Sequence, residues 1–272
     1  MGPPFSLDEF YDAYPRVEEQ FQADLDDGLD PRGPDFLFQL VGDMTLAPGA
    51  CALDVGCGEG RDTVQLATQF DLRATGIDPV ERHILLASEA LAAEPDDLSE
   101  RVSFKVGRAE ALPVDDRTMD LVWCRDVLSH VVAIDSACAE FRRVLRDDGR
   151  VLIYQMFGTA RLEPREAEWL WKTMGVAPGS ADPDQVERGF AAAGLQIEKR
   201  IVIGTEFGEW AEETSGKASR QLLHAARLLR SPDRYIAKFG NAAHEIMLGD
   251  CLWHVYGMIG KLSRRVYLLS SA

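Results

Sequence analysis

Short apolar segments alternate with segments of helical periodicity between residues 50 and 203. Apolar runs bounded by turn residues indicate buried strands, whereas apolar residues three and four positions apart indicate helices. This alternation predicts an α/β fold with a mostly parallel sheet, helices on both faces and ligands at the carboxyl ends of the strands. The predicted elements are strand 51–55, helix 61–70, strand 73–77, helix 80–93, strand 102–106, strand 119–124, helix 133–146, a turn at Asp147-Asp148-Gly149, strand 150–156, helix 163–174, helix 183–193 and strand 196–203.

The two ends of the chain follow other patterns. Residues 6–41 carry apolar groups at helical intervals, interrupted by Asp27-Gly28 and the proline-containing segment 31–34, which predicts a helix, a turn and a second helix. Residues 205–262 are helical in pattern, and the chain then returns to a seventh strand at 265–269. We therefore predict a helical insertion between the last two strands.

The composition favours a cytoplasmic protein that binds neither nucleic acid nor membrane. A chain of 272 residues can bury one substantial core and an accessory element. The net charge of −16 and the absence of a Lys/Arg-rich run disfavour binding to phosphate backbones. The sequence has no signal-peptide pattern and no apolar run long enough to span a membrane. Without Cys-x-x-Cys spacing, the cysteines are expected to be reduced thiols; they are Cys51, Cys57, Cys124, Cys138 and Cys251.

Residues 53–62 combine the end of an apolar strand with an acid and three alternating glycines. Because Gly56, Gly58 and Gly60 lack a Cβ, the backbone can turn sharply, approach a ligand and present free amides at the start of a helix. A dinucleotide-binding fingerprint has Gly-x-Gly-x-x-Gly instead, and its helix cradles a pyrophosphate. Here Asp54 precedes the first glycine by two residues, and its charge would repel phosphates. The loop therefore predicts a nucleotide-like ligand that carries a positive charge.

This loop and three later segments, in the same order, resemble the class I S-adenosylmethionine-dependent methyltransferases. The resemblance covers roughly residues 46–156. It implies S-adenosylmethionine as the cofactor and a Rossmann-like, doubly wound sheet of seven mostly parallel strands, with N-terminal helices and a helical cap between the last two strands. The three later segments are 74–79, 102–113 and 119–130.

The resemblance assigns cofactor contacts to the strand ends. Asp78 would accept hydrogen bonds from the ribose hydroxyls, and it could also cap the next helix, with Pro79 in its first turn. Arg108 stands where relatives carry an acid for the adenine amino group, which leaves the Ala109 amide and Glu110 for the adenine; Arg108 could equally point into water. The implied cofactor-binding residues are Asp54, Gly56, Cys57, Gly58, Gly60, Asp78, Pro79, Ala109, Glu110, Cys124 and Arg125.

His130 and Asp126 are the catalytic candidates. His130 matches the second residue of a His-His pair that many family members carry after the fourth strand, whereas Ser129 replaces the first. Asp126, four residues earlier, could orient the imidazole and raise its basicity. Two alternatives remain open: His130 packs or caps its helix, or Asp126 pairs with Arg125 or Arg142.

The resemblance also divides the chain into three parts. Residues 1–45 would form an N-terminal helical lid, with Phe10, Tyr11 and Tyr14 over the cofactor or packed on the sheet. Residues 46–204 and 263–272 would form the cofactor-binding core, and residues 205–262 a cap over the methyl acceptor.

Several polar residues outside the core motifs could contact the acceptor. Gln155 follows the fifth strand and could donate a hydrogen bond, but an amide cannot act as a base. In the cap, Glu206 and Trp210 could together receive a cationic or aromatic group. Asp250 and His254 are four residues apart on one helical face, either as an acid-oriented base or as a structural pair. No metal site is predicted.

The pattern predicts methyl transfer to oxygen or nitrogen of a small-molecule acceptor. A C-methyltransferase would be favoured if Arg125 bound a carboxylate or diphosphate on the acceptor. A cofactor-binding partner protein without activity and a nicotinamide dehydrogenase are the alternatives outside this chemistry. The sequence leaves a homodimer open.

Overall fold

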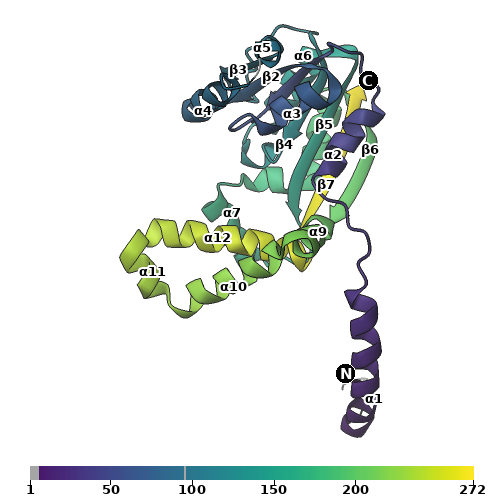
Figure 1. Ribbon diagram of the computed structural model, residues 1–272, viewed down its shortest axis with the longest axis vertical. Coiled ribbons are helices and arrows are strands. Elements are labelled where there is room, and N and C mark those ends of the chain that lie inside the picture. Colours follow the sequence, from purple (N-terminus) through teal and green to yellow (C-terminus); the bar gives the residue numbers. More distant parts are fainter. Residues whose placement is uncertain (1–5, 95) are drawn as a thin grey trace.

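A single seven-stranded sheet organises the computed structural model, which describes residues 6–94 and 96–272 (Figure 1). The strand order is β3-β2-β1-β4-β5-β7-β6; β1 to β5 run parallel, and β7 is antiparallel to both of its neighbours. The predicted doubly wound fold is confirmed. The strands are β1 (Cys51–Val55), β2 (Arg73–Asp78), β3 (Val102–Val106), β4 (Met119–Arg125), β5 (Leu145–Gly158), β6 (Leu195–Gly204) and β7 (Leu262–Ser271).

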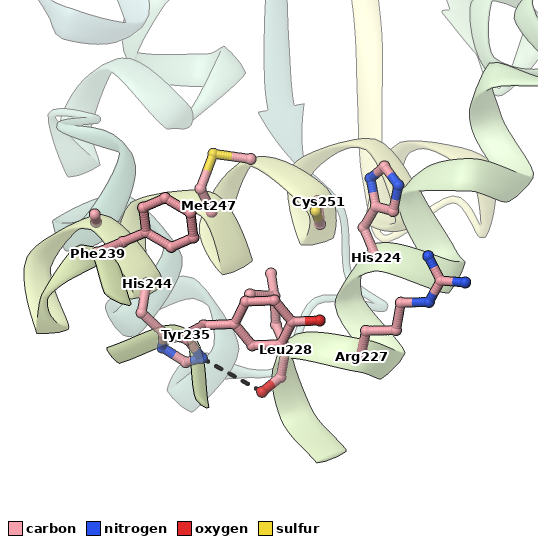
Figure 2. Close-up of a pocket in the computed structure, with 9 residues that line it drawn as sticks. His224, Arg227, Leu228, Tyr235, Phe239, His244, Met247 and Cys251 are labelled. Carbon is pink, nitrogen blue, oxygen red and sulfur yellow. Dashed lines mark hydrogen bonds between the residues drawn. The ribbon is translucent and has the colours of Figure 1, made fainter. Parts of the chain in front are cut away.

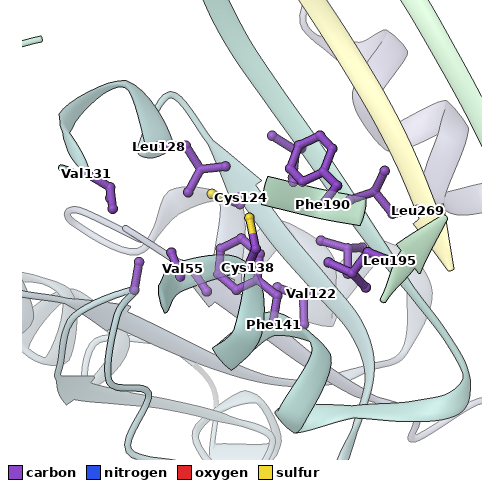
Figure 3. Packing of buried hydrophobic residues seen from close by; sticks show 14 of the residues in the cluster. Val55, Val122, Cys124, Leu128, Val131, Cys138, Phe141, Phe190, Leu195 and Leu269 are labelled. Atoms are coloured by element: carbon purple, nitrogen blue, oxygen red, sulfur yellow. The ribbon is translucent and has the colours of Figure 1, made fainter. Parts of the chain in front are cut away.

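Helices cover both faces of the sheet, each over its own apolar core. On one face, α6 (Ile134–Val144) and α8 (Pro183–Ala192) bury Phe141 and Phe190 against β1, β4 and β5 (Figure 3). On the other face, α2 (Asp35–Asp43) and α3 (Arg61–Phe70) pack with Trp123, which lies 4.8 Å from the Phe38 ring. The remaining core helices are α4 (Glu81–Leu91), α5 (Asp96–Ser99), α7 (Pro164–Met174) and the 3₁₀ turns η1 (Leu128–His130) and η2 (Pro178–Ala181).

The turn expected at Asp147-Asp148-Gly149 lies inside a strand. β5 begins at Leu145, and its register against β4 shifts between the pairs Met119–Leu145 and Leu121–Arg150. The additional residues of β5 therefore form a bulge, which leaves the two aspartates in solvent without ending the strand.

Four helices form the insertion between β6 and β7. They are α9 (Glu206–Ser215), α10 (Lys217–Arg230), α11 (Pro232–Phe239) and α12 (Asn241–Met258). The pair α10 and α12 packs closely, with the His244 ring near the Leu228 carbonyl, and α12 also packs on α7. This unit lies beyond the carboxyl ends of the parallel strands (Figure 1). The predicted helical insertion is confirmed.

The first helix, α1 (Leu7–Asp26), stands away from the sheet (Figure 1). Its first turn carries a capping box between Ser6 and Glu9, and Phe10, Tyr11 and Tyr14 are exposed. The linker to α2 is fixed by Arg32, which pairs with Glu206 and donates to the Val202 carbonyl at 3.0 Å. The prediction of two helices separated by a turn in this segment is confirmed. The lid role remains a prediction, and residues 1–5 of that segment lie outside the described part.

None of the helices in the described residues is both long and apolar enough to cross a membrane.

Candidate active site

The glycine loop after β1 forms the base of the cleft. Gly56, Gly58 and Gly60 have φ angles of 77°, 52° and 84°, which side-chain-bearing residues rarely adopt. A Cβ on Gly56 would lie 2.1 Å from Val127 Cγ2, and one on Gly60 would lie 2.5 Å from Phe104 Cζ. A Cβ on Gly58 would meet nothing within 4 Å, because this residue faces the open cleft. The loop thus offers a cradle that only glycines can form.

Asp54 is buried at the bottom of this cradle. Its side chain is 2% exposed and accepts a hydrogen bond from the Thr63 hydroxyl at 2.6 Å. Burial raises the pKa of Asp54 to about 7, and the neighbouring acids Asp62 and Asp78 act in the same direction. The surrounding hollow has a volume of about 320 Å³. A buried acid with a raised pKa favours a ligand that brings a positive charge.

We predict that binding of S-adenosylhomocysteine depends on the ionisation of Asp54. The ammonium group of the ligand requires the carboxylate, so affinity should fall about tenfold as the pH is lowered from 8 to 6, through the raised pKa. The unliganded protein should lose stability as the pH rises from about 4 to about 7, because only the native carboxyl still holds its proton there. Calorimetry at several pH values measures the affinity. Asp54→Asn should bind more weakly and without this pH dependence; an unchanged pH profile in that variant would contradict the assignment.

Asp78 lies at the end of β2, facing the glycine loop. Its carboxylate accepts the Gly58 amide at 3.0 Å and the Val80 amide at 2.8 Å, and His83 Nδ1 lies 3.1 Å away. The expected capping role differs in detail, because α4 has Val80 as its N-cap and Pro79 precedes the helix. Asp78 instead forms a turn that fixes the strand end beside the loop.

The side of the cleft where the resemblance would place the adenine, called the adenine side below, is a hollow of about 400 Å³. Asp78, Pro79, Ala109 and Glu110 line it together with Val127. The side chain of Arg108 is 69% exposed and lies 3.4 Å from Glu110. The position of Arg108 therefore agrees with the alternative that this side chain points into water.

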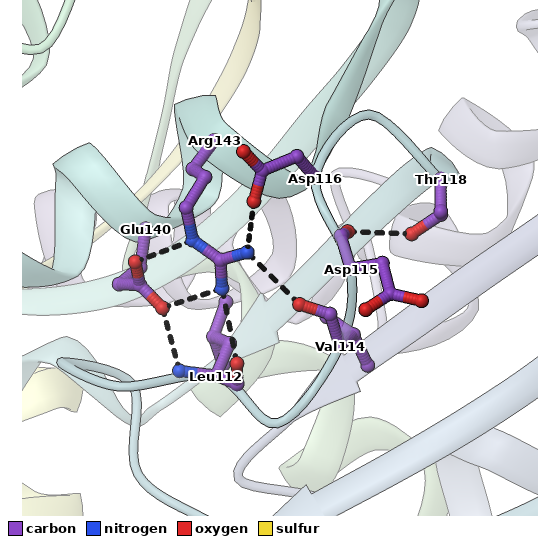
Figure 4. A network of polar contacts seen from close by, with 7 residues as sticks. All are labelled: Leu112, Val114, Asp115, Asp116, Thr118, Glu140 and Arg143. Carbon is purple, nitrogen blue, oxygen red and sulfur yellow. Dashed lines mark hydrogen bonds and ion pairs between the residues drawn. The ribbon is translucent and has the colours of Figure 1, made fainter.

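Arg143 of α6 holds the loop that carries these adenine-side residues (Figure 4). Its guanidinium donates to the carbonyls of Leu112 and Val114 at 3.0 and 2.9 Å and pairs with Asp116 and Glu140. Glu140 in turn accepts the Leu112 amide at 2.7 Å. The network ties the loop to the core through an arginine far from it in sequence.

We expect Arg143→Met to destabilise the protein by about 1–3 kcal/mol, because the carbonyls of the loop lose a charged donor. Affinity for S-adenosylhomocysteine should also fall several-fold, since the loop positions Ala109 and Glu110. Urea denaturation and calorimetry measure the two effects. Arg142→Met removes the same charge one position earlier and is the control; equal effects in both variants would argue against the network.

The end of β4 sends alternate side chains to opposite faces. Cys124 is fully buried in the core, so only its backbone faces the cleft. Arg125 lies 3.2 Å from Asp62 and 5.9 Å from the centre of the Tyr154 ring. It lines all three hollows around the strand ends. Asp62, at the start of α3, also accepts from the Trp123 indole at 3.2 Å.

Asp126 stands where these hollows meet. It lines the glycine-loop hollow, the adenine-side hollow and a third cavity under the cap. Its φ is 57°, an uncommon conformation for a non-glycine residue, and it precedes the 3₁₀ turn η1 and is not part of a helix. Its carboxyl faces the open cleft, but the cleft walls restrict its hydration, which raises the pKa of Asp126 to about 6. The cations Arg125 and Arg264 oppose this shift.

His130 lies on the adenine side of Asp126. Its Nδ1 donates to the Gly175 carbonyl at 2.9 Å, so Gly175 orients the imidazole in place of the expected Asp126. This hydrogen bond leaves Nε2 free to accept a proton. His130 does not line the cavity under the cap.

The cavity under the cap has a volume of about 400 Å³ and aromatic walls. Phe207 stacks on Tyr154 with ring centres 5.3 Å apart, and Trp210 and Trp253 also line the cavity. His254 also faces this cavity; its Nε2 lies 3.8 Å from Asp250, and desolvation lowers the pKa of His254. The cavity therefore combines apolar surface with a neutral imidazole.

Two other residues that were expected to contact the methyl acceptor lie outside this cavity. Gln155 is fully buried, on the sheet face opposite to Tyr154, and donates to the Ser180 carbonyl. Glu206 is paired with Arg32 and fixes the linker. Of the expected pair Glu206 and Trp210, only Trp210 lines the cavity. Gln155 is outside the site because side chains alternate between the two faces of a strand. Glu206 is outside it because it pairs with Arg32, which is distant in sequence.

Arg264 of β7 is a site residue that the sequence pattern did not single out. It lines the cavity under the cap and is 6% exposed. A signal was present, because Arg264 shares a strand face with Leu262, Val266 and Leu268, where an apolar residue is expected. No cluster of potential metal ligands occurs among the described residues.

Comparisons with known proteins relate part of the chain to methyltransferases. Residues 53–153 match the family described as "Methyltransferase domain". A segment is 33% identical to the 27-O-demethylrifamycin SV methyltransferase of Amycolatopsis mediterranei (strain S699), over 42% of each chain. Another is 31% identical to Methyltransferase GfsG of Streptomyces halstedii, over 56% of this chain and 62% of that protein. The matches span about half the length of these curated relatives.

The crystal structure of the 4+2 cyclase SpnF has the same fold. Its TM-score is 0.66 and its identity 24%, over 87% of this chain and 80% of that chain. The matched family segment contains the glycine loop, Asp78 and Asp126, each at the end of a parallel strand. The matched segment, residues 53–153, is thus similar to the domain of the class I S-adenosylmethionine-dependent methyltransferases.

Proposed function

We propose that the protein transfers a methyl group from S-adenosylmethionine to oxygen or nitrogen of a small-molecule acceptor held under the cap. The observation that carries the proposal is the position of Asp126, which lines both cofactor-side hollows and the aromatic cavity. Acceptor and cofactor would therefore meet beside this carboxyl.

The described residues fit S-adenosylmethionine. Asp54 suits its ammonium group, Asp78 its ribose hydroxyls, and the walls at Ala109 and Glu110 its adenine, while Gly58 leaves room for the ligand backbone. When bound, this cofactor supplies an activated methyl group. The protein would contribute alignment of the acceptor and exclusion of water.

Asp126 and His254 are the groups available to take a proton from the acceptor. A hydroxyl acceptor loses its proton during attack, whereas a neutral amine already has a free lone pair. The raised pKa of about 6 keeps Asp126 ionised at neutral pH yet makes it a stronger base than an ordinary carboxylate. His254 is neutral at this pH because its pKa is lowered. His130, on the adenine side, would position the cofactor.

Calorimetric titration with S-adenosylhomocysteine tests the cofactor assignment. Asp78→Ala should weaken binding about 10–100-fold, because it removes the acceptor of two ligand hydrogen bonds. A titration with NADH should show no binding, which separates the proposal from a dehydrogenase. Unchanged affinity in Asp78→Ala, or tight NADH binding, would overturn it.

The fold alone does not establish methyl transfer, since a 4+2 cyclase shares it. Turnover is therefore tested by the release of S-adenosylhomocysteine from S-adenosylmethionine with panels of phenols, hydroxy acids and amines. Stoichiometric formation of a methylated product would support the proposal. Product formation without consumption of S-adenosylmethionine would identify a different reaction.

A further inference from the structure

Arg264 is a buried cation in the wall of the cavity under the cap. Its side chain is 6% exposed, and its Nη1 has no hydrogen-bond partner among the described residues. The neighbouring Arg265, on the other face of β7, lies 3.7 Å from Glu187. Asp126 lines the same cavity and interacts with Arg264 electrostatically, but no carboxylate of the described residues forms an ion pair with Arg264 within 4 Å; the Tyr154 hydroxyl lies beside the guanidinium. A buried charge without a close counter-ion is costly, so its retention indicates an anionic ligand.

The packing of α12 fixes the guanidinium in this position. A Cβ on Gly257 would lie 2.9 Å from Arg264 Nη1 and 3.0 Å from Nη2. The guanidinium therefore rests against the backbone of α12, and a larger side chain at this position would displace it. The cation is held at the inner end of the cap, on the same cavity wall as Met156.

A second cavity of about 450 Å³ lies farther along the cap, between α10, α11 and α12 (Figure 2). Both cavities follow the seam between α10 and α12. Along α10, Gln221 lines the inner cavity and His224 and Leu228 the outer one. Along α12, His254 lines the inner cavity and Met247 the outer one. These spacings of three, four and seven residues place each set on one helical face.

The outer cavity is mainly apolar. Leu228, Tyr235, Phe239 and Met247 form much of its lining, and Figure 2 shows their side chains around one hollow. The ten positions from His254 to His244 correspond to about 15 Å along a helix. A ligand that filled both cavities would be elongated, with a charged end at Arg264 and an apolar body between the helices.

We propose that the methyl acceptor is an elongated, mainly apolar molecule that carries one anionic oxygen group, a carboxylate or a phosphate, besides the hydroxyl or amine that is methylated. This inference rests on the proposed function. Arg264 binds the anionic group, and the apolar body lies in the α10–α12 seam and reaches the outer cavity. Arg264 is thus a specificity residue for charge, and the outer cavity selects for length.

The first experiment compares the head groups of ten-carbon probes. Decanoate, decyl phosphate and decan-1-ol are titrated into the protein saturated with S-adenosylhomocysteine, with the fluorescence of Trp210 and Trp253 as the signal. One of the two anions should bind about 10–100-fold more tightly than the alcohol, and the better one identifies the group. Arg264→Gln should reduce this preference to below about threefold, and Arg264→Lys should retain part of it. Arg265→Gln, on the other face of the strand, is the control and should keep the preference.

The second experiment measures the dependence on chain length. From hexanoate to decanoate, affinity should rise about fourfold per methylene, as expected for burial of apolar surface. Ala243→Phe places a ring in the outer cavity, about 21 Å along α12 from Gly257, and should remove the gain of a sixteen-carbon acid, which is long enough to reach that position, while leaving hexanoate unchanged. Ala242→Phe, on the exposed side of α12, should behave like the unmodified protein.

Equal binding of acids and alcohol, a preference that survives Arg264→Gln, or a length dependence untouched by Ala243→Phe would each overturn the inference. These titrations require no methyl transfer. Failure of the protein to bind S-adenosylhomocysteine in separate calorimetry would count against the proposed function instead, so the two failures are distinguishable.

Discussion

Replacing Asp126 by asparagine is expected to lower the rate of methyl transfer to a hydroxyl acceptor by about 10²–10⁴-fold, the usual contribution of a positioned base. The amide keeps the shape of the side chain and tolerates the positive φ of 57°, but it cannot take a proton. Affinity for S-adenosylhomocysteine should change less than threefold. Initial rates at saturating cofactor and calorimetry measure the two quantities.

The pH profile supplies a readout that a structural role would not alter. Because the cleft walls restrict the hydration of Asp126 and raise its pKa to about 6, the rate should fall as the pH is lowered through that value, when the carboxylate becomes protonated. In Asp126→Asn this acid limb should disappear. Asp71→Asn is the matched control, since Asp71 also has a positive φ, of 54°, but ends α3 outside the cleft. A rate in Asp126→Asn equal to that of the control would remove Asp126 from the mechanism and leave His254 as the base.

The second large effect is expected at the glycine loop. Gly56→Ala combines a strained positive φ with a Cβ 2.1 Å from Val127 Cγ2, so we expect a loss of about 2–5 kcal/mol in stability. Affinity for S-adenosylhomocysteine should fall at least tenfold, because the loop must move. Urea denaturation measures the stability change.

Two further variants separate strain from collision. Gly49→Ala has a similar φ of 75° and no atom within 4 Å of the new Cβ, so it should cost only about 1–2 kcal/mol and leave binding intact. Adding Val127→Ala to Gly56→Ala removes the collision and should recover about 1–3 kcal/mol in a double-mutant cycle. Absence of coupling between the two positions would show that contact with Val127 does not limit the loop.

Local pattern and topology were enough to predict which acids gather at the carboxyl ends of the parallel strands. Asp54, Asp78 and Asp126 each follow a parallel strand, and the carboxyl ends of such strands meet at one edge of the sheet. Their proximity therefore follows from the order of the elements. The glycine spacing also specifies the turn, since Gly56, Gly58 and Gly60 each have a positive φ.

Contacts between distant segments could not be read in the same way. The orientation of His130 depends on the Gly175 carbonyl, which lies 45 residues later. Arg264 reaches the cavity because β7 inserts antiparallel between β5 and β6, an arrangement that no local motif encodes. Such residues become apparent only when the cap is folded onto the strand ends.

The position of the cap within the β6–β7 connection has a consequence for how this protein could change during evolution. Gly204 and Arg264 are paired neighbours in the sheet, so both ends of the insertion leave the core at the same place. An exchange of α9 to α12 for helices from a relative would leave the five parallel strands and their bound nucleotide undisturbed. Arg264 would remain with the core, whereas the seam would leave with the cap. Preference for an acidic acceptor and preference for its length would therefore be inherited separately.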